Sequence, residues 1–574
     1  MTATSTRPVR GRRRFALPRR RLGRPTEGAI WLALLVIASA VQTVVVLRLV
    51  RTSWFGVDAL YYVATRGPIP SADEGLFRPY GGHWQTIPLL VYRGLFAVFG
   101  LRTYVPYVGL ALTLHLAIVF VMFALLRSVG AHVRTAAVTA GLLLFYGGGA
   151  EAFMWDAPMV LTSGLLLGLI AALVLVRSDF STRSQVVAAV LLLGAVMCSG
   201  TGLVAATTVG CFAFLRAGVR GTLIVSGPAT LAFTVWFYTI GRDGRVHFSP
   251  RSIPEVPGFV WSGLTGSLGS VVGVPVTGWI LLLLLAGAVA LAEVRTEALR
   301  QLAVAGIAGA VTQLTLSSFA SLLVSDQAAR VSRYQYIVLV LLAASIALAL
   351  EAAARAAGAR TWTARLVPLA AVVVLAVAIG HGITLERRQA DYGASSAILY
   401  KTWVFGGLEA ADAGEKQLVQ DASSGFNGGR FELFAAPQLR HELPAAPSGP
   451  QPRLDTESEY FTEVSSLDPG LFSPTRIVSI GGLNGPPGHK PGCYSYLTDG
   501  SGQPEIDIAT GSGTEVGITS GSTLVATQLV RDGVESKPRI WFVAPGAVYV
   551  ATTAKNATLR ISLNGSGPVA VCHR

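Results

Sequence analysis

The chain of 574 residues has few charged residues and little cysteine. Charged residues make up 14% of the sequence and hydrophobic residues 52%, and the mean hydropathy is +0.54. Soluble domains carry about 25% charged residues, so this composition excludes an ordinary soluble protein. The four cysteines show no Cys/His spacing that suggests a zinc site.

Lysine is also scarce: all of it lies after residue 386, and arginine supplies most of the positive charge. The formal net charge is +14, and nine arginines lie in the first 24 residues. They directly precede the first long apolar run, as in a cytoplasmic flank that is attracted to anionic lipid. This arrangement favours membrane lipids as partners and argues against nucleic acid. The composition, rich in alanine, glycine and arginine, is typical of a bacterial protein.

Long apolar runs fill residues 29–386, which we interpret as a multi-pass transmembrane domain after a basic cytoplasmic tail at 1–28. A helix needs about 20 apolar residues to cross a bilayer. By this rule there are eleven candidate spans, at 29–49, 104–126, 135–149, 157–176, 185–199, 201–216, 222–240, 275–293, 302–324, 335–354 and 366–385. The first run is longer than the apolar part of a signal peptide, so we expect a retained helix.

Two other features of this domain have structural interpretations. The semi-hydrophobic stretch 89–99 is expected to lie along the membrane interface. His115 lies in the middle of a candidate span, and we expect it to be a hydrogen-bonded packing residue rather than a ligand.

Arginine marks every second connection between the candidate spans. These connections fall on the same side as the amino-terminal tail if the spans alternate, and they contain Arg127 and Arg134, Arg177 and Arg183, Arg216 and Arg220, Arg295 and Arg300, and Arg355, Arg360 and Arg365. The positive-inside rule therefore predicts a cytoplasmic amino terminus and an external carboxyl terminus in the plasma membrane.

Residues 387–574 contain no long apolar run and form a predicted extracytoplasmic domain. From about residue 475, short alternating runs such as RIWFVA and TLRISLN predict an antiparallel β sandwich. The predicted fold class is therefore an α-helical polytopic membrane protein of about eleven transmembrane helices with a C-terminal, mainly-β, sandwich-like domain. Cys493 and Cys572 bracket the predicted sandwich in an oxidising compartment, which predicts a disulfide between them.

The first external loop, residues 51–103, concentrates polar chemistry next to the membrane. Its segment 54–88 contains Asp58, Asp73, Glu74, Arg78, His83 and Trp84. A carboxylate at the lipid–water boundary is partly desolvated and is a stronger base, so Asp58 is the first candidate for a catalytic base. Its alternative is a solvated acid at a helix end.

Other residues of this loop have candidate roles. Asp73 and Glu74 are candidates for catalysis or metal binding, which leaves a divalent cation open as a cofactor, and their alternative is a surface pair. Arg78 is a candidate for substrate binding, and His83 is a candidate for phosphate binding. Trp84 is a candidate for stacking on a sugar ring, although it also suits an interfacial anchor.

Two later external segments add candidates. Glu151 and Asp156 follow three glycines in GGGAEAFMWDAP, where glycine permits close backbone approach or a sharp turn, and an acid at membrane depth usually faces a cavity or a partner. Arg330 and Arg333, in SDQAARVSRYQY, lie on the external side against the positive-inside trend. Bidentate contact with a lipid phosphate explains them. A salt bridge to Asp326 and snorkelling to headgroups are the alternatives.

The segment VDALYYVATRG, an acid followed by tyrosines just after the first span, resembles the DEAYY-type opening of the GT-C superfamily of membrane glycosyltransferases. The Arg333–Tyr334 pair in SRYQY, which opens a late span, resembles the same group. So do the many spans, the large first external loop and the C-terminal external domain. The second acid of the usual pair is Ala59 here, so either Asp58 works alone, or Asp73 and Glu74 supply the partner, or the site is degenerate.

The resemblance implies transfer of a sugar from a polyprenyl-phosphate donor to a cell-envelope glycan or lipid acceptor on the outer face. Such a reaction needs a base for the acceptor hydroxyl and positive charge for the departing phosphate. Arg333 and Tyr334 are candidates for substrate binding. A non-catalytic envelope scaffold or glycan-binding protein stays open because of Ala59. A transporter or flippase also stays open, although the two halves of the chain show no similarity.

Overall fold

The structure is a computed structural model of the chain. It describes residues 26–66, 75–155, 159–244, 250–291, 297–321, 326–358 and 363–412, and after these the strands between 462 and 573. The arginine-rich tail, Asp73, Glu74 and Asp156 lie outside the described residues.

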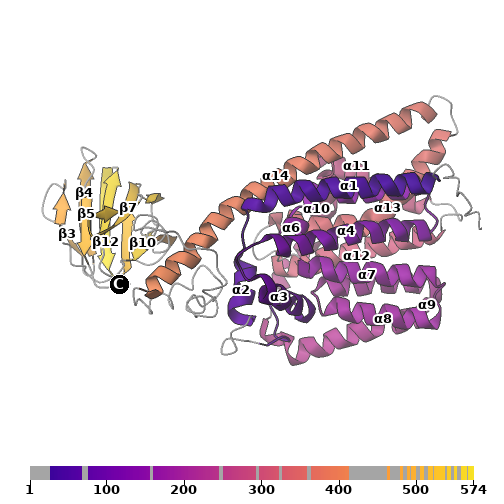
Figure 1. Cartoon of the computed structure of the whole chain (residues 1–574), viewed down its shortest axis with the longest axis horizontal. Helices are drawn as coiled ribbons and strands as arrows, with labels where there is room; N and C mark the ends of the chain where they lie inside the picture. Colours follow the sequence, from indigo (N-terminus) through magenta and orange to yellow (C-terminus); the bar gives the residue numbers. More distant parts are fainter. Residues whose placement is uncertain are drawn as a thin grey trace, which may run out of the picture.

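The chain is an α-helical multi-pass membrane protein with a small C-terminal β region (Figure 1). Long apolar helices form the bundle, and their bounds are α1 Glu27–Leu49, α4 Val105–Ser128, α7 Met159–Arg177, α9 Thr201–Thr239, α12 Glu297–Ser321, α13 Ser332–Gly358 and α14 Thr363–Asp412. Shorter apolar helices complete it, namely α5 Val133–Leu144, α8 Thr182–Val196 and α11 Pro275–Ala290. Within the described ranges, six of the helices are long and apolar enough to cross a membrane by themselves.

Helix α9 is two antiparallel helices joined at Gly218. This glycine has φ of +70°, a conformation that interrupts a helix and that residues with a Cβ rarely adopt. Thr222 Oγ1 donates to the Gly210 carbonyl at 3.1 Å, and Ser226 Oγ donates to the Ala206 carbonyl at 2.9 Å, so the second half folds back on the first. The two separate runs predicted at 201–216 and 222–240 are thereby confirmed.

Short helices gather at one end of the bundle (Figure 1). They are α2 Val57–Arg66, α3 Thr86–Phe99 and α6 Glu151–Met154, while α10 Val256–Gly269 precedes α11. Short 3-10 segments connect several helices: η1 Val50–Thr52, η3 Gly147–Gly149, η4 Gly241–Gly244, η5 Pro250–Glu255 and η7 Asp326–Arg330. The stretch 89–99 that was predicted to be interfacial lies within α3.

Helix α14 continues far past residue 386, where the sequence suggested a boundary between domains. Its extension packs on the loops at the end of the bundle that carries α2, α3 and α6. The Tyr392 ring stacks on Trp155 with centroids 5.5 Å apart, and the Lys401 ammonium lies 5.8 Å from the centroid of Trp54. The helix thus extends beyond the bundle (Figure 1).

The β region consists of two antiparallel sheets. The strands are β1 Thr462–Ser465, β2 Ser479–Gly481, β3 Gly488–Lys490, β4 Cys493–Asp499, β5 Glu505–Ala509, β6 Glu515–Ser520, β7 Thr523–Arg531, β8 Val534–Glu535, β9 Arg539–Val543, β10 Val548–Thr552, β11 Thr558–Asn564 and β12 Ser566–His573. One sheet has the order β1-β10-β6-β12-β4-β3, and the other has the order β2-β5-β11-β7-β8 with β9 also paired to β7. In the first sheet, Cys493 of β4 lies directly opposite Cys572 of β12.

Candidate functional site

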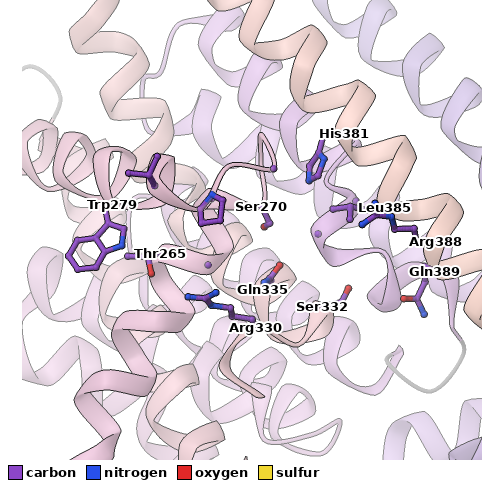
Figure 2. A pocket seen from close by; sticks show the side chains of 17 residues that line it. Thr265, Ser270, Trp279, Arg330, Ser332, Gln335, His381, Leu385, Arg388 and Gln389 are labelled. Atoms are coloured by element: carbon purple, nitrogen blue, oxygen red, sulfur yellow. The ribbon is translucent and has the colours of Figure 1, made fainter. Parts of the chain in front are cut away.

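A cavity of about 850 Å³ lies among α10, α11, α13, α14 and η3 (Figure 2). Its lining is small and polar near η3 and apolar along α11. The lining residues are Gly147, Gly148, Thr265, Gly266, Gly269, Ser270, Gly273, Pro275, Val276, Trp279, Arg330, Ser332, Gln335, His381, Leu385, Arg388 and Gln389.

The charge of this lining is entirely positive. Arg330 and Arg388 contribute guanidinium groups from different elements, and no aspartate or glutamate is among the described lining residues. Arg330 Nε donates to Ser262 Oγ at 3.1 Å, which holds the side chain against α10. Arg388 makes no hydrogen bond or ion pair with any residue in the described part of the chain. The cavity therefore suits an anion.

The glycines of η3 allow α14 to approach closely. A Cβ on Gly147 would lie 2.1 Å from the Gly382 carbonyl oxygen, and one on Gly382 would lie 2.0 Å from the Phe145 carbonyl oxygen. A Cβ on Gly149 would meet the Tyr336 ring at 2.6 Å. Of the two roles that the sequence left open for these glycines, the structure shows close backbone approach.

Glu151 and Arg333 form an ion pair beside the cavity. Arg333 Nη1 donates to Glu151 Oε1 at 2.5 Å, and the Arg333 backbone N–H donates to Glu151 Oε2 at 3.3 Å. The Glu151 carboxylate therefore satisfies a free N–H at the start of α13, where negative charge is favoured. The Glu151 backbone N–H donates to Ser332 Oγ at 3.2 Å, and Ser332 lines the cavity.

Tyr334 contacts this pair through its ring. The Arg333 guanidinium carbon lies 5.4 Å from the centroid of the Tyr334 ring. Neither Arg333 nor Tyr334 is among the described lining residues, so their predicted contact with substrate stays a prediction. The side chain of Asp326, the alternative partner of the external arginines, lies outside the described residues.

Asp58 lies at the start of α2 and accepts a hydrogen bond from the Tyr80 hydroxyl. The Tyr80 ring packs against Tyr62 with centroids 5.3 Å apart, and the Tyr62 hydroxyl donates to Gln85 Oε1 at 2.5 Å. Ala59 is 1% exposed, so an acid at this position would be buried among apolar side chains. Asp58 is not among the described lining residues, and its role as a base stays a prediction.

His83 and Trp84 are held by packing contacts in the same region. His83 Nδ1 accepts the Gly200 backbone N–H at 3.3 Å. Removal from water lowers the pKa of the His83 imidazole, and the positive charge of Arg333 lowers it further. The Trp84 ring stacks on Trp236 with centroids 5.2 Å apart, so one of its faces is already occupied.

Two remaining sequence predictions have clear positions in the structure. Arg78 is exposed in the described part of the first external loop. His115 bonds through both ring nitrogens, to the Tyr336 hydroxyl at 2.8 Å and to the Leu144 carbonyl at 3.2 Å. Its predicted packing role is confirmed.

The sequence interpretation missed His381, Arg388 and Gln389 of α14, as well as Trp279 of α11. The available signal was the Arg387–Arg388 pair, which directly follows the last candidate span on the predicted outer side, against the positive-inside trend. No group of three or more His, Cys, Asp or Glu in the described ranges could hold a metal ion.

Comparison with known proteins gives one partial likeness to report. No protein-family model and no curated protein matches the sequence. The crystal structure of ArnT from Cupriavidus metallidurans bound to undecaprenyl phosphate is similar over 66% of this chain and 80% of that chain, with 14% sequence identity and a TM-score of 0.40. An identity this low assigns a role to no residue here, so the chemistry of the cavity rests on its own side chains.

Proposed function

We propose that the chain is a membrane glycosyltransferase that binds a polyprenyl-phosphate-linked sugar donor in the cavity and passes the sugar to a cell-envelope acceptor on the outer face. The lining of the cavity carries the proposal. It contains two arginines and an apolar rim, and no aspartate or glutamate is among the described lining residues. Each part of such a donor has a matching surface.

The phosphate matches the arginines. Guanidinium groups bind phosphate oxygens through parallel N–H donors, and Arg330 and Arg388 reach the cavity from opposite sides (Figure 2). The Ser270 and Ser332 hydroxyls and the Gln335 amide add neutral donors to the same lining. Because no described acid lines the cavity, nothing there offsets the attraction for a dianionic or monoanionic phosphate.

The prenyl chain matches α11. Pro275, Val276 and Trp279 line the cavity, and the helix continues from them with an exposed apolar face. Val276 is 61% exposed and Leu283 is 68% exposed, although both are apolar. A lipid tail that leaves the cavity along this face would stay in contact with hydrocarbon.

The chemistry needs one proton acceptor. The acceptor hydroxyl oxygen bonds to the anomeric carbon, the bond from that carbon to the phosphate oxygen breaks, and the hydroxyl proton passes to a base. The departing phosphate keeps the electron pair and is stabilised by Arg330 and Arg388. Asp58 is the base predicted from sequence, and His381 supplies the one imidazole among the described lining residues.

A second candidate function is a non-catalytic envelope protein that binds the same lipid phosphate. The all-positive lining favours it, because a binding cavity needs no carboxylate. Burial of Ala59 at the position of the usual second acid favours it as well.

Binding is tested first. Purified protein in lipid nanodiscs should bind undecaprenyl phosphate, and Arg330→Ala or Arg388→Ala should each weaken binding about 10- to 100-fold, because a charge-assisted hydrogen bond contributes about 1.5–3 kcal/mol. Arg387→Ala is the matched control, since Arg387 is exposed on the same helix and does not line the cavity. Equal binding of the uncharged prenyl alcohol, or equal losses in all three variants, would reject the phosphate site.

Transfer is tested second, with radiolabelled sugar on a lipid-linked donor in membranes that express each variant. Asp58→Asn removes the base but keeps the shape, so turnover should fall by about two to four orders of magnitude if Asp58 is the base. The same loss in His381→Gln, with normal transfer by Asp58→Asn, would assign the base to His381. Intact binding without transfer by the wild type, for every donor tried, would support the second candidate function.

A further inference from the structure

A buried acid and a buried amide meet inside the helix bundle, away from the cavity lining. Gln42 of α1 and Glu386 of α14 are both 0% exposed. Gln42 Nε2 donates to Glu386 Oε1 at 2.6 Å, which joins two helices that are far apart in sequence. A glutamate in such a place needs a physical explanation, because ionisable groups inside a membrane are costly and are rarely unpaired.

The hydrogen bonding of this pair is half complete. Gln42 Oε1 and Glu386 Oε2 are both buried and have no hydrogen-bond partner among the described residues. No cation in the described part of the chain forms an ion pair with Glu386, whereas Arg388, half a turn along α14, lines the cavity. A buried acceptor without a donor costs about 1–3 kcal/mol, and an unpaired buried carboxylate costs more.

We infer that Glu386 binds a proton and is held as a neutral carboxylic acid whose O–H donates to Gln42 Oε1. One proton then satisfies both unpartnered atoms, because an acid and a primary amide form a ring of two hydrogen bonds. A metal cation fits less well, since hard cations take about six or more oxygen ligands and this pair offers two. The proton is therefore the ligand of this site.

The neutral pair has two consequences for α14. It fastens the helix to α1 on one side, while His381, Leu385 and Arg388 on the same helix line the cavity. It also places no negative charge next to Arg388, so the positive charge of the cavity stays available for an anion. This inference goes beyond the proposed function, because the proton site stands whether or not sugar transfer takes place.

Infrared difference spectroscopy of the nanodisc protein tests the protonation directly. The wild type minus Glu386→Gln difference at neutral pH should contain the C=O band of a protonated carboxylic acid and no band of an ionised carboxylate. Glu351→Gln is the matched control, because Glu351 accepts the His132 backbone N–H at 2.7 Å in a more exposed position and should contribute carboxylate bands. Carboxylate bands from Glu386 at neutral pH would overturn the inference.

Thermal unfolding gives an independent test. Glu386→Gln keeps both hydrogen bonds, so its Tm should equal that of the wild type, and Gln42→Leu should lower Tm by about 2–4 °C. The double variant Gln42→Glu with Glu386→Gln, which exchanges the two groups, should recover the loss. A clear gain in Tm for Glu386→Gln would mean that a buried charge had been removed, and a sodium-dependent Tm abolished by the same substitution would mean a metal site; either result contradicts the inference.

Discussion

At the scale of single residues, three arginines of η7, α13 and α14 have different surroundings. Arg333 is neutralised by Glu151, whereas Arg330 and Arg388 reach a cavity with no described acid. Among the described residues, Arg330 bonds to the neutral Ser262 hydroxyl, which does not cancel its charge. Arginines close together in the chain thus have different tasks: Arg333 secures the start of α13, whereas Arg330, together with Arg388 of α14, creates the positive field in the cavity.

The Glu151–Arg333 pair should contribute measurably to stability. Glu151→Gln keeps the shape but removes the charge that faces Arg333, whose side chain is 40% exposed. Partial exposure reduces the cost below that of a fully buried pair, so we expect a loss of about 1–2 kcal/mol in the free energy of unfolding. The control is Glu297→Gln, which breaks an exposed pair with Arg300 at 3.3 Å and should cost less than about 0.5 kcal/mol. Equal melting temperatures for Glu151→Gln and Glu297→Gln would contradict the expected difference between a partly buried ion pair and an exposed one.

His83 should make stability depend on pH. Its pKa is lowered from the ordinary 6.5 in the folded protein by burial and by Arg333, so the unfolded chain takes up the proton first as the pH falls. Stability should therefore be complete above about pH 6.5 and should decrease as the pH falls toward the lower folded pKa. His83→Gln keeps an acceptor for the Gly200 N–H and should flatten this part of a plot of Tm against pH. If the slope of Tm against pH is unchanged in His83→Gln, groups other than His83 cause the pH dependence.

At the scale of elements, α14 determines the architecture of the site. It lies against η3 through backbone contacts at Gly382, lines the cavity with four of its residues, and bonds to α1 through Glu386. Gly382 and Glu386 are four residues apart and lie close together on one face of the helix. A shift of α14 would therefore change the cavity and the contact with α1 together.

Two glycines of α14 provide a matched test of this packing. Gly382→Ala places a methyl group 2.0 Å from the Phe145 carbonyl oxygen, so the helix must move, and we expect a loss of about 1–3 kcal/mol or more together with weaker lipid-phosphate binding. Gly380→Ala, two residues away, meets nothing within 4 Å and should be neutral or stabilise by up to about 1 kcal/mol. Melting temperature and lipid binding of the two variants check this expectation. Similar results for both would mean that the contact with η3 does not position α14.

At the scale of the whole molecule, the chain is a bundle of helices, which α14 extends beyond, and a C-terminal β region (Figure 1). Arginines at alternate connections predict which end of the bundle faces the cytoplasm. The cavity and the β region would then share the outer side, where a lipid-linked donor and an envelope acceptor can meet.

Reporter fusions test this orientation. A reporter that is active only outside the membrane should be active when fused after Arg574 and silent when fused after Arg127. The two fusions control each other, because they carry the same reporter at opposite predicted faces. The reverse result would overturn the orientation and would place the cavity on the cytoplasmic side.

The β region should contain a disulfide between Cys493 and Cys572. Their backbone positions lie directly opposite in an antiparallel pair, where Cα atoms are about 4.5–5.5 Å apart, within the range that a disulfide spans. Mass spectrometry of unreduced peptides should find the two linked, while Cys198 and Cys211 stay free thiols. Two unlinked cysteines in freshly isolated protein would exclude the bond.

The sequence by itself determined the properties that depend on local runs of residues. Apolar length predicted the helices, including the two halves of α9, and alternating polarity predicted the C-terminal strands, because hydropathy and periodicity act within a few turns of chain. The special backbone role of the glycines at 147–149 and the packing role of His115 follow from single residue types. Glycine has no Cβ, and a histidine inside a membrane needs hydrogen-bond partners.

Only the tertiary structure decided which of these residues meet. The cavity combines η3, α10, α11, α13 and α14, and no local pattern reports that Arg388 lies opposite Arg330. Asp58 bonds to Tyr80, Glu151 to Arg333 and Glu386 to Gln42, three pairings between different elements of the chain. Such contacts depend on how the helices pack. Side-chain shape and close backbone approach determine that packing, and the hydropathy of a single segment encodes neither of the two.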